Sequence, residues 1–288
     1  MKPPPFRYER PESVEEALSL LSEEGDDAKV LAGGQSLVPL LAFRMVRPAV
    51  LIDIGRLLEL ESLALDGSTM VIGARVTHRA VERFPGIEDR CPVIREAVDQ
   101  IGHVAIRNLG TVGGSLAHAD PAAEWPLLAL TLEAEFDLRS RAESRTLPAK
   151  DMFVGYMTTA LRPDEMITAI RLELPKAGTA FVEIARRHGD FAMGGSAAVV
   201  VIRDGVVTTA RIGLLAAAMT PVRSHESENI LIGREPAEAL LREAAEAVDS
   251  AIDPLGDVHA SAEYKRHLAK VTALRALRVA CRRAKEMA

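Results

Sequence analysis

Cysteine is scarce in this chain: its 288 residues include two, Cys91 and Cys281, far apart in the sequence. A thiolate zinc site or an iron–sulfur centre needs several cysteines at close spacing, so this chain cannot build either alone. A disulfide framework is equally unsupported, which fits a reducing compartment. We therefore expect no metal centre in the chain itself.

Aromatic residues, long apolar runs and an excess of basic charge are also missing. Aromatics make up 4% of the residues, and no window is long and apolar enough to span a membrane. The N-terminal residues 1–5 lack the apolar core of a signal peptide. The formal net charge of −6 argues against nucleic acid as the main partner, since phosphate backbones attract clustered basic surfaces. These absences predict a cytoplasmic protein with no membrane insertion and no nucleic-acid partner.

Two short glycine-rich stretches are the most informative feature that is present. They are Ala32-Gly33-Gly34-Gln35-Ser36 and Thr111-Val112-Gly113-Gly114-Ser115. Adjacent glycines let a backbone turn sharply and expose its N–H groups, and such amides form concavities that hold phosphate oxygens. Neither stretch has the Gly-x-Gly-x-x-Gly spacing of a Rossmann domain, nor the spacing of a P-loop. Each alone is also explained by a tight turn. Together they predict two backbone binding sites, one for each of the two phosphates of a dinucleotide.

The periodicity of apolar residues predicts three consecutive lobes of α+β structure. Residues 1–54 hold a helix between Ser13 and Gly25 and strands at 29–32 and 49–54. Residues 55–176 hold strands at 69–74, 135–139 and 167–174 and helices at 79–83, at 92–101 and from Pro121 to about Leu132. Residues 177–288 hold a hairpin at Asp204-Gly205 and helices at 236–252 and 261–285. We expect a C-terminal domain of antiparallel sheet plus helices.

Five ordered motifs resemble the FAD-binding (medium) subunit of molybdenum hydroxylases of the aerobic carbon monoxide dehydrogenase and xanthine dehydrogenase type. Two are the glycine stretches with their flanks, 32–41 and 106–115. The others are Leu51-Ile52-Asp53-Ile54, His118-Ala119-Asp120-Pro121-Ala122-Ala123-Glu124 and Arg186-Arg187-His188-Gly189-Asp190-Phe191-Ala192. The resemblance spans essentially the whole chain. It implies a two-lobed FAD-binding domain of the vanillyl-alcohol-oxidase type, followed by the C-terminal domain.

The resemblance also implies where FAD is held, between the N-terminal and middle lobes. Cofactor-binding positions that it implies are Ala32, Gly33, Gly34, Gln35, Ser36, Leu37, Thr111, Val112, Gly113, Gly114, Ser115, Glu124, Ile167 and Phe191. For Glu124 a solvent-facing charge is the alternative, and for Ile167 and the similar Ile101 core packing is favoured. Phe191 stands where relatives carry Tyr, and it could stack on the flavin or pack in the core.

Some residues near these motifs depart from the pattern or point elsewhere. Glu183 stands where many relatives carry Lys, so a cofactor contact through that side chain is not implied. His78, His103 and His118 show no metal-ligand spacing and are expected to be surface or capping residues. Asp53 is expected to cap or turn the end of its strand.

The implied function is electron transfer within a larger enzyme. In the family, substrate is hydroxylated at a molybdenum cofactor in a large subunit, and electrons pass through [2Fe–2S] clusters of a small subunit to FAD. They leave to an external acceptor such as a quinone, NAD or oxygen. The resemblance thus implies a dimer of heterotrimers, with no catalytic residue in this chain because the flavin carries the chemistry. Two alternatives remain open: a self-sufficient flavoenzyme on the same fold, for example resembling UDP-N-acetylenolpyruvoylglucosamine reductase, and a non-catalytic nucleotide-sensing module.

Overall fold

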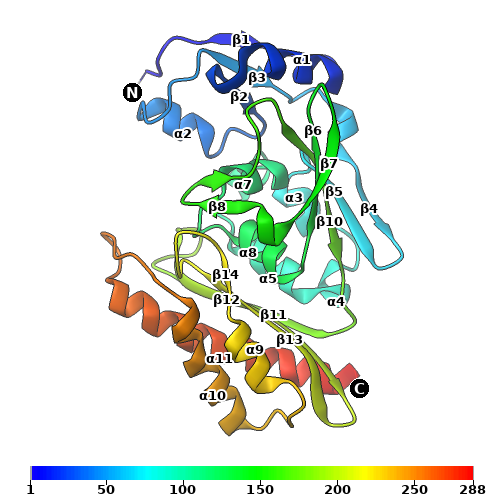
Figure 1. The fold of residues 1–288 in the computed structure, drawn as a ribbon, viewed down its shortest axis with the longest axis vertical. Coiled ribbons are helices and arrows are strands. Elements are labelled where there is room, and N and C mark those ends of the chain that lie inside the picture. Colours follow the sequence, from blue (N-terminus) through cyan, green and yellow to red (C-terminus); the bar gives the residue numbers. More distant parts are fainter. Residues whose placement is uncertain (1, 288) are drawn as a thin grey trace.

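The computed structural model describes residues 2–287, in which three lobes follow one another along the chain (Figure 1). The first lobe is a three-stranded parallel sheet with the order β1-β3-β2. Its elements are β1 (Arg7–Glu9), α1 (Val14–Glu24), β2 (Ala28–Leu31), α2 (Leu37–Ala42) and β3 (Val50–Asp53). The predicted first helix is confirmed: the Ser13 side chain accepts the N–H of Glu16 at 3.1 Å, and Gly25 ends the helix with φ of 53°.

The middle lobe is a five-stranded antiparallel sheet with helices packed against it. The strand order is β4-β5-β10-β6-β7. Its strands are β4 (Leu63–Asp66), β5 (Thr69–Gly73), β6 (Glu135–Arg139), β7 (Ser144–Pro148) and β10 (Met166–Glu173), with a small hairpin of β8 (Phe153–Gly155) and β9 (Thr158–Thr159) beside it. Its helices are α3 (His78–Glu82), α4 (Ile87–Arg90), α5 (Pro92–Gln100), α6 (Val104–Arg107), α7 (Val112–His118) and α8 (Glu124–Thr131).

The C-terminal lobe is a four-stranded antiparallel sheet followed by three helices. Its elements are β11 (Gly178–Ala185), β12 (Ala192–Arg203), β13 (Val206–Leu215), β14 (Val222–Arg223), α9 (His225–Leu231), α10 (Glu238–Ala247) and α11 (Ala262–Met287). The predicted hairpin is confirmed, with Asp204 and Gly205 at φ of 50° and 80° between β12 and β13. This lobe and its helices match the expected α+β fold.

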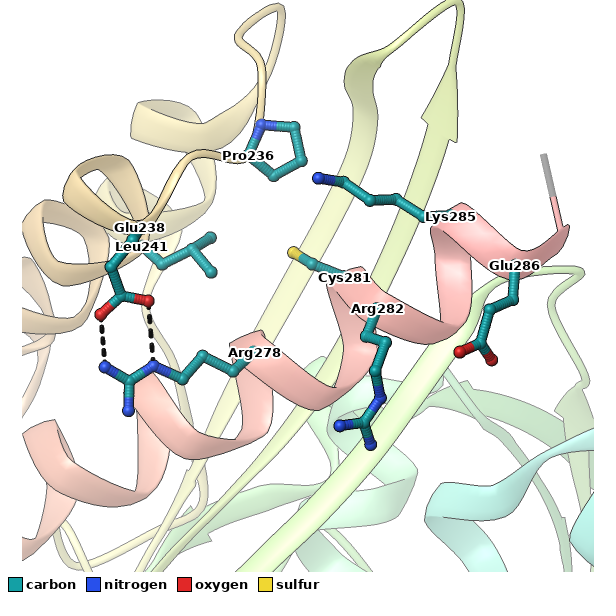
Figure 2. Close-up of a pocket in the computed structure, with 8 residues that line it drawn as sticks. All are labelled: Pro236, Glu238, Leu241, Arg278, Cys281, Arg282, Lys285 and Glu286. Carbon is teal, nitrogen blue, oxygen red and sulfur yellow. Dashed lines mark hydrogen bonds and ion pairs between the residues drawn. The ribbon is translucent and has the colours of Figure 1, made fainter.

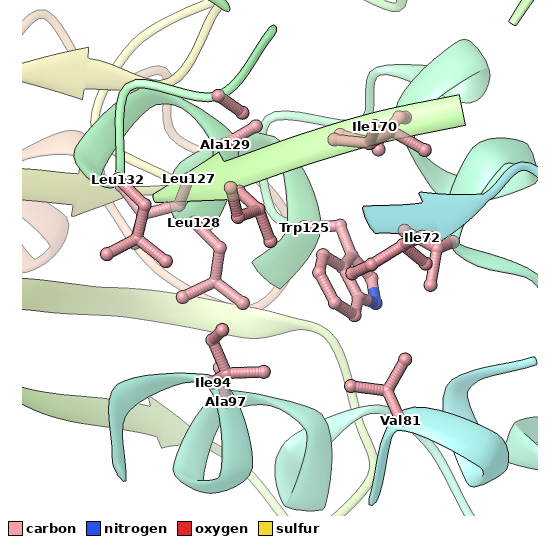
Figure 3. Packing of buried hydrophobic residues seen from close by; sticks show 14 of the residues in the cluster. Ile72, Val81, Ile94, Ala97, Trp125, Leu127, Leu128, Ala129, Leu132 and Ile170 are labelled. Atoms are coloured by element: carbon pink, nitrogen blue, oxygen red, sulfur yellow. The ribbon is translucent and has the colours of Figure 1, made fainter. Parts of the chain in front are cut away.

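The main core lies where the middle lobe meets the C-terminal sheet. Figure 3 shows side chains of α8, among them Trp125 and Leu128, between the sheet residues Ile72 and Ile170 and the helix residue Ile94. The C-terminal sheet contributes Phe181 and Val199 to the same core. Its other face packs on α11, so closely that a side chain at Gly178 would lie 2.0 Å from the Ala280 carbonyl oxygen. The C-terminal sheet is therefore the layer between α5 and α8 on one side and the last helices on the other (Figure 1).

Two local predictions were wrong. The helix predicted from Pro121 begins at Glu124, because the Asp120 side chain accepts the N–H of Ala122 at 2.8 Å and holds a turn there. Gly113 and Gly114 lie in the first turn of α7 rather than in an open loop. Thr111 caps that helix by accepting the N–H of Gly114 at 3.0 Å.

Candidate functional site

The two glycine stretches, distant in sequence, touch each other in the structure. A Cβ atom at Gly33 would lie 2.0 Å from the carbonyl oxygen of Leu109 and 2.9 Å from the Cα of Gly110. At Gly114, the Cβ of Ala32 is within van der Waals distance of the corresponding position, at 3.9 Å. The first lobe and the middle lobe thus approach each other through glycine backbone. We call residues 32–37 the first loop and residues 109–115 the second loop.

The first loop presents a run of free backbone donors. Among residues 2–287, the N–H groups from Ala32 to Leu37 donate no hydrogen bond to the protein. The carbonyl oxygens are in use: that of Gly34 accepts from Val38 at 3.1 Å, and that of Gly33 from the Gln35 side chain at 3.1 Å. Gly34 has φ of 72°, a conformation that glycine adopts without strain. Consecutive amides of this kind make a concavity that binds an anion such as a phosphate.

The second loop does not form the expected second amide concavity. The N–H of Val112 donates to Val76 at 2.9 Å, that of Gly113 to Ala74 at 3.0 Å, and that of Gly114 to the Thr111 hydroxyl. The N–H of Ser115 donates back to the Thr111 carbonyl at 3.0 Å. Gly113 is needed here for close packing, because a Cβ would lie 2.6 Å from Ala74. The amides of Val112 to Ser115 are thus used within the protein, and what this stretch can offer a ligand is the Ser115 hydroxyl and a close approach of backbone.

A buried polar network holds the segment that leads into the second loop. The Arg107 guanidinium, 6% exposed, donates to the carbonyl oxygens of Ile101 and Gly102, both at 3.0 Å, and to Glu82 at 3.1 Å. Arg79 also pairs with Glu82. Because a buried charge is tolerated only when paired, this network fixes residues 101–107 in one conformation.

His78 is a second support, and its predicted surface position is wrong. The ring is 4% exposed, and its Nδ1 accepts the N–H of Trp125 at 3.0 Å. The His78 backbone N–H donates to the Gly110 carbonyl at 3.0 Å, and a Cβ at Gly110 would lie 2.9 Å from the ring. Burial, with the nearby Arg107 charge, lowers the pKa of His78 to about 4, so the ring is neutral at physiological pH. Its role is to pack beneath the second loop.

Three large apolar side chains of the motif segments are exposed. Val38, next to the first loop, is 50% exposed, Leu109 in the second loop 58%, and Phe191, in the segment after β11, 72%. Core packing, the alternative for Phe191, is thereby excluded. Large apolar side chains left exposed beside a polar loop, such as Val38 and Leu109, are typical of a surface that a ligand or a partner covers.

Two other predicted residues lie inside the protein. Ile167 is 5% exposed and packs in the main core, as does Ile101 at 9%. Glu124 is 8% exposed at the N-terminus of α8, so it is not a solvent-facing charge.

The remaining candidates have structural surroundings. Asp53 turns the end of β3 as predicted, accepting the N–H of Gly55 at 2.7 Å. His103 is exposed and precedes α6, and His118 is half-buried at the end of α7. Within residues 2–287, no cluster of His, Cys, Asp and Glu is suited to hold a metal ion. In the same residues, no helix is long and apolar enough to cross a membrane.

A surface groove of about 420 Å³ lies elsewhere, between α10 and α11 in the C-terminal lobe. Figure 2 shows Glu238 and Arg278 paired at one end of this groove and Lys285 and Glu286 at the other, with Cys281 at its floor. Its lining carries charges of both signs, and none of its residues belongs to either glycine loop.

The first loop thus offers free backbone amides, and the second loop begins a closely packed helix. The sequence matches two family models in the same order: "FAD binding domain in molybdopterin dehydrogenase" over residues 4–176 and "CO dehydrogenase flavoprotein C-terminal domain" over residues 179–280. The chain belongs to this family of FAD-binding subunits of molybdenum-dependent dehydrogenases. It is an oxidoreductase component, and FAD is the cofactor of its family.

Relatives of known identity cover nearly the whole chain. The 6-hydroxypseudooxynicotine dehydrogenase complex subunit alpha of Paenarthrobacter nicotinovorans is 42% identical to this chain. The match covers 99% of this chain and 97% of that relative. A solved carbon monoxide dehydrogenase of Hydrogenophaga pseudoflava has a TM-score of 0.95 at 38% identity, covering 98% of this chain and 99% of that one. Quinoline 2-oxidoreductase of Pseudomonas putida 86 has a TM-score of 0.94 at 35% identity, covering 99% of both. The family and the fold that the sequence motifs predict are therefore confirmed.

Sequence reasoning missed the residues that support the loops. Arg107 lies inside the motif 106–115, but no pattern pairs it with Glu82, because that contact depends on how α3 and α6 cross. His78 and Trp125 are 47 residues apart in the sequence, so their hydrogen bond has no local signal. The sequence also gave no sign that Glu183 lies near Glu124.

Proposed function

We propose that this chain is the electron-transfer subunit that carries FAD in a molybdenum hydroxylase complex. Its expected partners are a large molybdopterin-binding subunit and a small [2Fe–2S] subunit, arranged as a dimer of heterotrimers. Electrons would reach this subunit from the small one and leave to an external acceptor. The bound flavin supplies the two-electron chemistry, and the chain contributes binding, orientation and electrostatics.

The observation that carries the proposal is the meeting of the two glycine loops at Gly33 and Leu109. A diphosphate bridging the lobes needs donors that are not already used, and the first loop has them from Ala32 to Leu37. The Ser36 and Ser115 hydroxyls add neutral hydrogen-bonding groups. Several other positions assigned to FAD on motif grounds are buried in the protein, among them Val112, Glu124 and Ile167.

The residues around the loops have distinct tasks in this proposal. The first loop binds phosphate oxygens through backbone N–H groups, which are fixed in place and lose no side-chain entropy. Exposed Phe191 provides an apolar ring that can lie against a flavin, although Phe cannot donate the hydrogen bond that Tyr could. No side chain of the chain is assigned to act on the substrate.

The substrate of the complex belongs to the large subunit in this proposal. The relatives named above act, by their names, on a nicotine derivative, on carbon monoxide and on quinoline. A nitrogen heterocycle is therefore as consistent with this chain as carbon monoxide. Identifying the large subunit that co-purifies would decide the substrate class.

Purifying the chain alone and with its co-expressed neighbours tests the proposal. We expect a yellow protein with a flavin spectrum and one FAD per chain, which has no turnover alone and gains it when the molybdenum and iron–sulfur subunits are added. Turnover by the yellow chain alone would favour a self-sufficient flavoenzyme. A colourless chain that cannot be reconstituted with FAD would exclude both.

A further inference from the structure

Two acidic side chains, Glu124 and Glu183, lie near enough to repel each other at the junction of the middle lobe and the C-terminal sheet. Glu124 is the first residue of α8, and α8 packs on β12 and β13. On β11, side chains alternate between the two faces of the sheet. Thr179 and Phe181 lie on the face toward α5, where Thr179 accepts the N–H of Val93 at 3.2 Å, so Glu183 points to the same side.

The strand register explains how the two acids come together. Glu183 pairs with Gly195 on β12, and Gly195 pairs with Leu215 on β13. The next residue, Ala216, donates its N–H to Pro121 at 2.9 Å, in the turn that leads into Glu124. Gly195 contributes no side chain beside Glu183, and the Leu215 side chain packs over it, 3.1 Å from where a Cβ would lie.

Neither acid has a basic partner. Among the ion pairs of residues 2–287, none includes Glu124 or Glu183, and the Glu183 Oε2 atom is buried with no hydrogen-bond partner. The other charged group that acts on Glu124 is Asp120, also an acid. The N-terminus of α8 carries a partial positive charge, which favours a negative charge on Glu124. This partial charge is opposed by the charges of two neighbouring acids, Glu183 and Asp120.

Glu124 is buried, and Glu183 is half-buried with its Oε2 atom shielded from solvent. Two carboxylates held together in such a place without a cation are unfavourable, and the simplest remedy is a proton. We propose that Glu124 and Glu183 form a proton-binding pair that holds one proton between its two carboxyl groups at neutral pH. A proton from solvent adds to one carboxylate oxygen, an O–H bond forms, and the remaining carboxylate accepts its hydrogen bond. The unpartnered Oε2 of Glu183 is the atom that such a hydrogen bond would satisfy.

The direction in which the two groups titrate agrees with this geometry. Burial raises the pKa of Glu183 to about 7. Burial, then the charges of Glu183 and Asp120, raise the pKa of Glu124 well above its usual range. The contrast is Glu165, which is also buried but paired with Arg145 at 2.7 Å, so that its pKa is lowered in spite of burial.

Glu124 follows the second loop closely in the chain. Residues 119–123 join α7, which begins in that loop, to α8. The segment after β11 packs on the residues that precede α6, where a Cβ at Gly189 would lie 3.0 Å from the His103 ring and from the Gly102 backbone. A link between the pair and the charge of a bound flavin rests on the proposed function, whereas the shared proton does not.

Infrared spectroscopy of the purified protein tests the shared proton with or without FAD. At pH 7 we expect a carboxylic acid C=O band that shifts in D₂O and is lost in the Glu124→Gln/Glu183→Gln double variant. Glu183→Lys should also remove the band, because an ammonium group beside Glu124 favours its carboxylate. Glu165→Gln is the matched control and should keep the band. A wild-type protein without the band, or a double variant that retains it, would overturn the proposal.

A second measurement does not depend on whether the variants fold. In wild-type protein with ¹³C-labelled glutamate, a carboxyl signal should titrate well above those of the other glutamates, and its absence would also overturn the pair. Reduction of the FAD-loaded protein with dithionite then tests the link to the flavin, which predicts a change of the acid band. An acid band that does not change on reduction would show that the pair is not linked to the flavin. A chain that binds no FAD would contradict the proposed function. In either case the acid band of the wild-type protein still tests whether the pair shares a proton.

Discussion

Gly33 is the residue on which the contact between the lobes depends most directly. Its position has no room for a side chain, because a Cβ would lie 2.0 Å from the Leu109 carbonyl oxygen, which belongs to the backbone and cannot rotate away. Any larger residue must therefore separate the two loops. The sequence pattern explains a glycine at this position by a tight turn. The contact with Leu109 is a second and stricter reason, because it leaves no space for a side chain.

Gly33→Ala should weaken FAD binding at least tenfold and destabilise the fold by about 1–3 kcal/mol, as overpacking does. FAD titration and urea denaturation measure the two effects. Gly67→Ala is the control, since nothing lies within 4 Å of a Cβ there, although φ of 61° carries a small strain of its own. A Gly33→Ala protein that binds FAD as the wild type does would contradict the role of this contact.

Glu183 and Glu124 make stability depend on pH in a definite direction. Their pKa values are raised in the folded protein, so the folded state binds more protons than the unfolded state between pH of about 4.5 and about 7. Stability should fall as pH rises through this window, by at most about 1.4 kcal/mol per pH unit for each proton. Carboxylates with lowered pKa values, such as Glu165, have the opposite effect at acidic pH. The stability that they contribute is lost as pH falls through their pKa values in the folded protein.

Urea denaturation between pH 5 and 8 checks this prediction. Glu183→Gln should make the decline shallower, because it removes one titrating group and the like charge beside Glu124. The exposed Glu226→Gln is the control and should keep the wild-type slope. A decline that is equally steep in the Glu183→Gln protein would mean that other groups cause it.

At the scale of elements, α6 and α7 deliver the second loop, and their placement rests on buried contacts. Arg107, on α6, is bound by Glu82 of α3 and by the carbonyl oxygens of Ile101 and Gly102. Removing one partner leaves a buried charge unpaired, which is the costly case for an ion pair. The loop geometry is thus supported from beneath rather than by the glycines alone.

Arg107→Ala should lower the free energy of unfolding by about 3–5 kcal/mol and weaken FAD binding. Arg234→Ala is the control: Arg234 and Glu243 are each about half exposed, and such pairs contribute about 0–1 kcal/mol. Chemical denaturation compares them. Equal effects of the two substitutions would show that the Arg107 network does not hold the segment.

Local patterns predicted the elements where the signal is local. The helix between Ser13 and Gly25, the helix predicted at 79–83 (α3) and the Asp204-Gly205 turn are each confirmed within a residue or two. Residues 111–115 show the limit: the sequence indicates flexible glycines with free amides, whereas Thr111 caps a helix and tertiary contacts use those amides. Pairing across strands and helices, as for Glu124 and Glu183, depends on register and cannot be found from spacing.

At the scale of the whole molecule, the three lobes share their surfaces rather than packing as separate units. The C-terminal sheet completes the main core with Phe181 and Val199, and Gly213 brings β13 against Thr131 of α8, where a Cβ would lie 2.1 Å from its hydroxyl oxygen. The middle lobe therefore lies between the first loop on one side and the last helices on the other (Figure 1). A ligand that bridges the first two lobes would therefore contact a middle lobe whose core is shared with the third lobe.

Hydrogen exchange with and without FAD tests the central claim, that the two loops form one FAD site with unequal roles. We expect FAD to protect the backbone amides of Gly33 to Ser36, which are free in the protein alone. It should change the exchange of the Val112 to Gly114 amides little, because they are already hydrogen-bonded. Saturating FAD that leaves the amides of residues 33–36 in rapid exchange would contradict this claim.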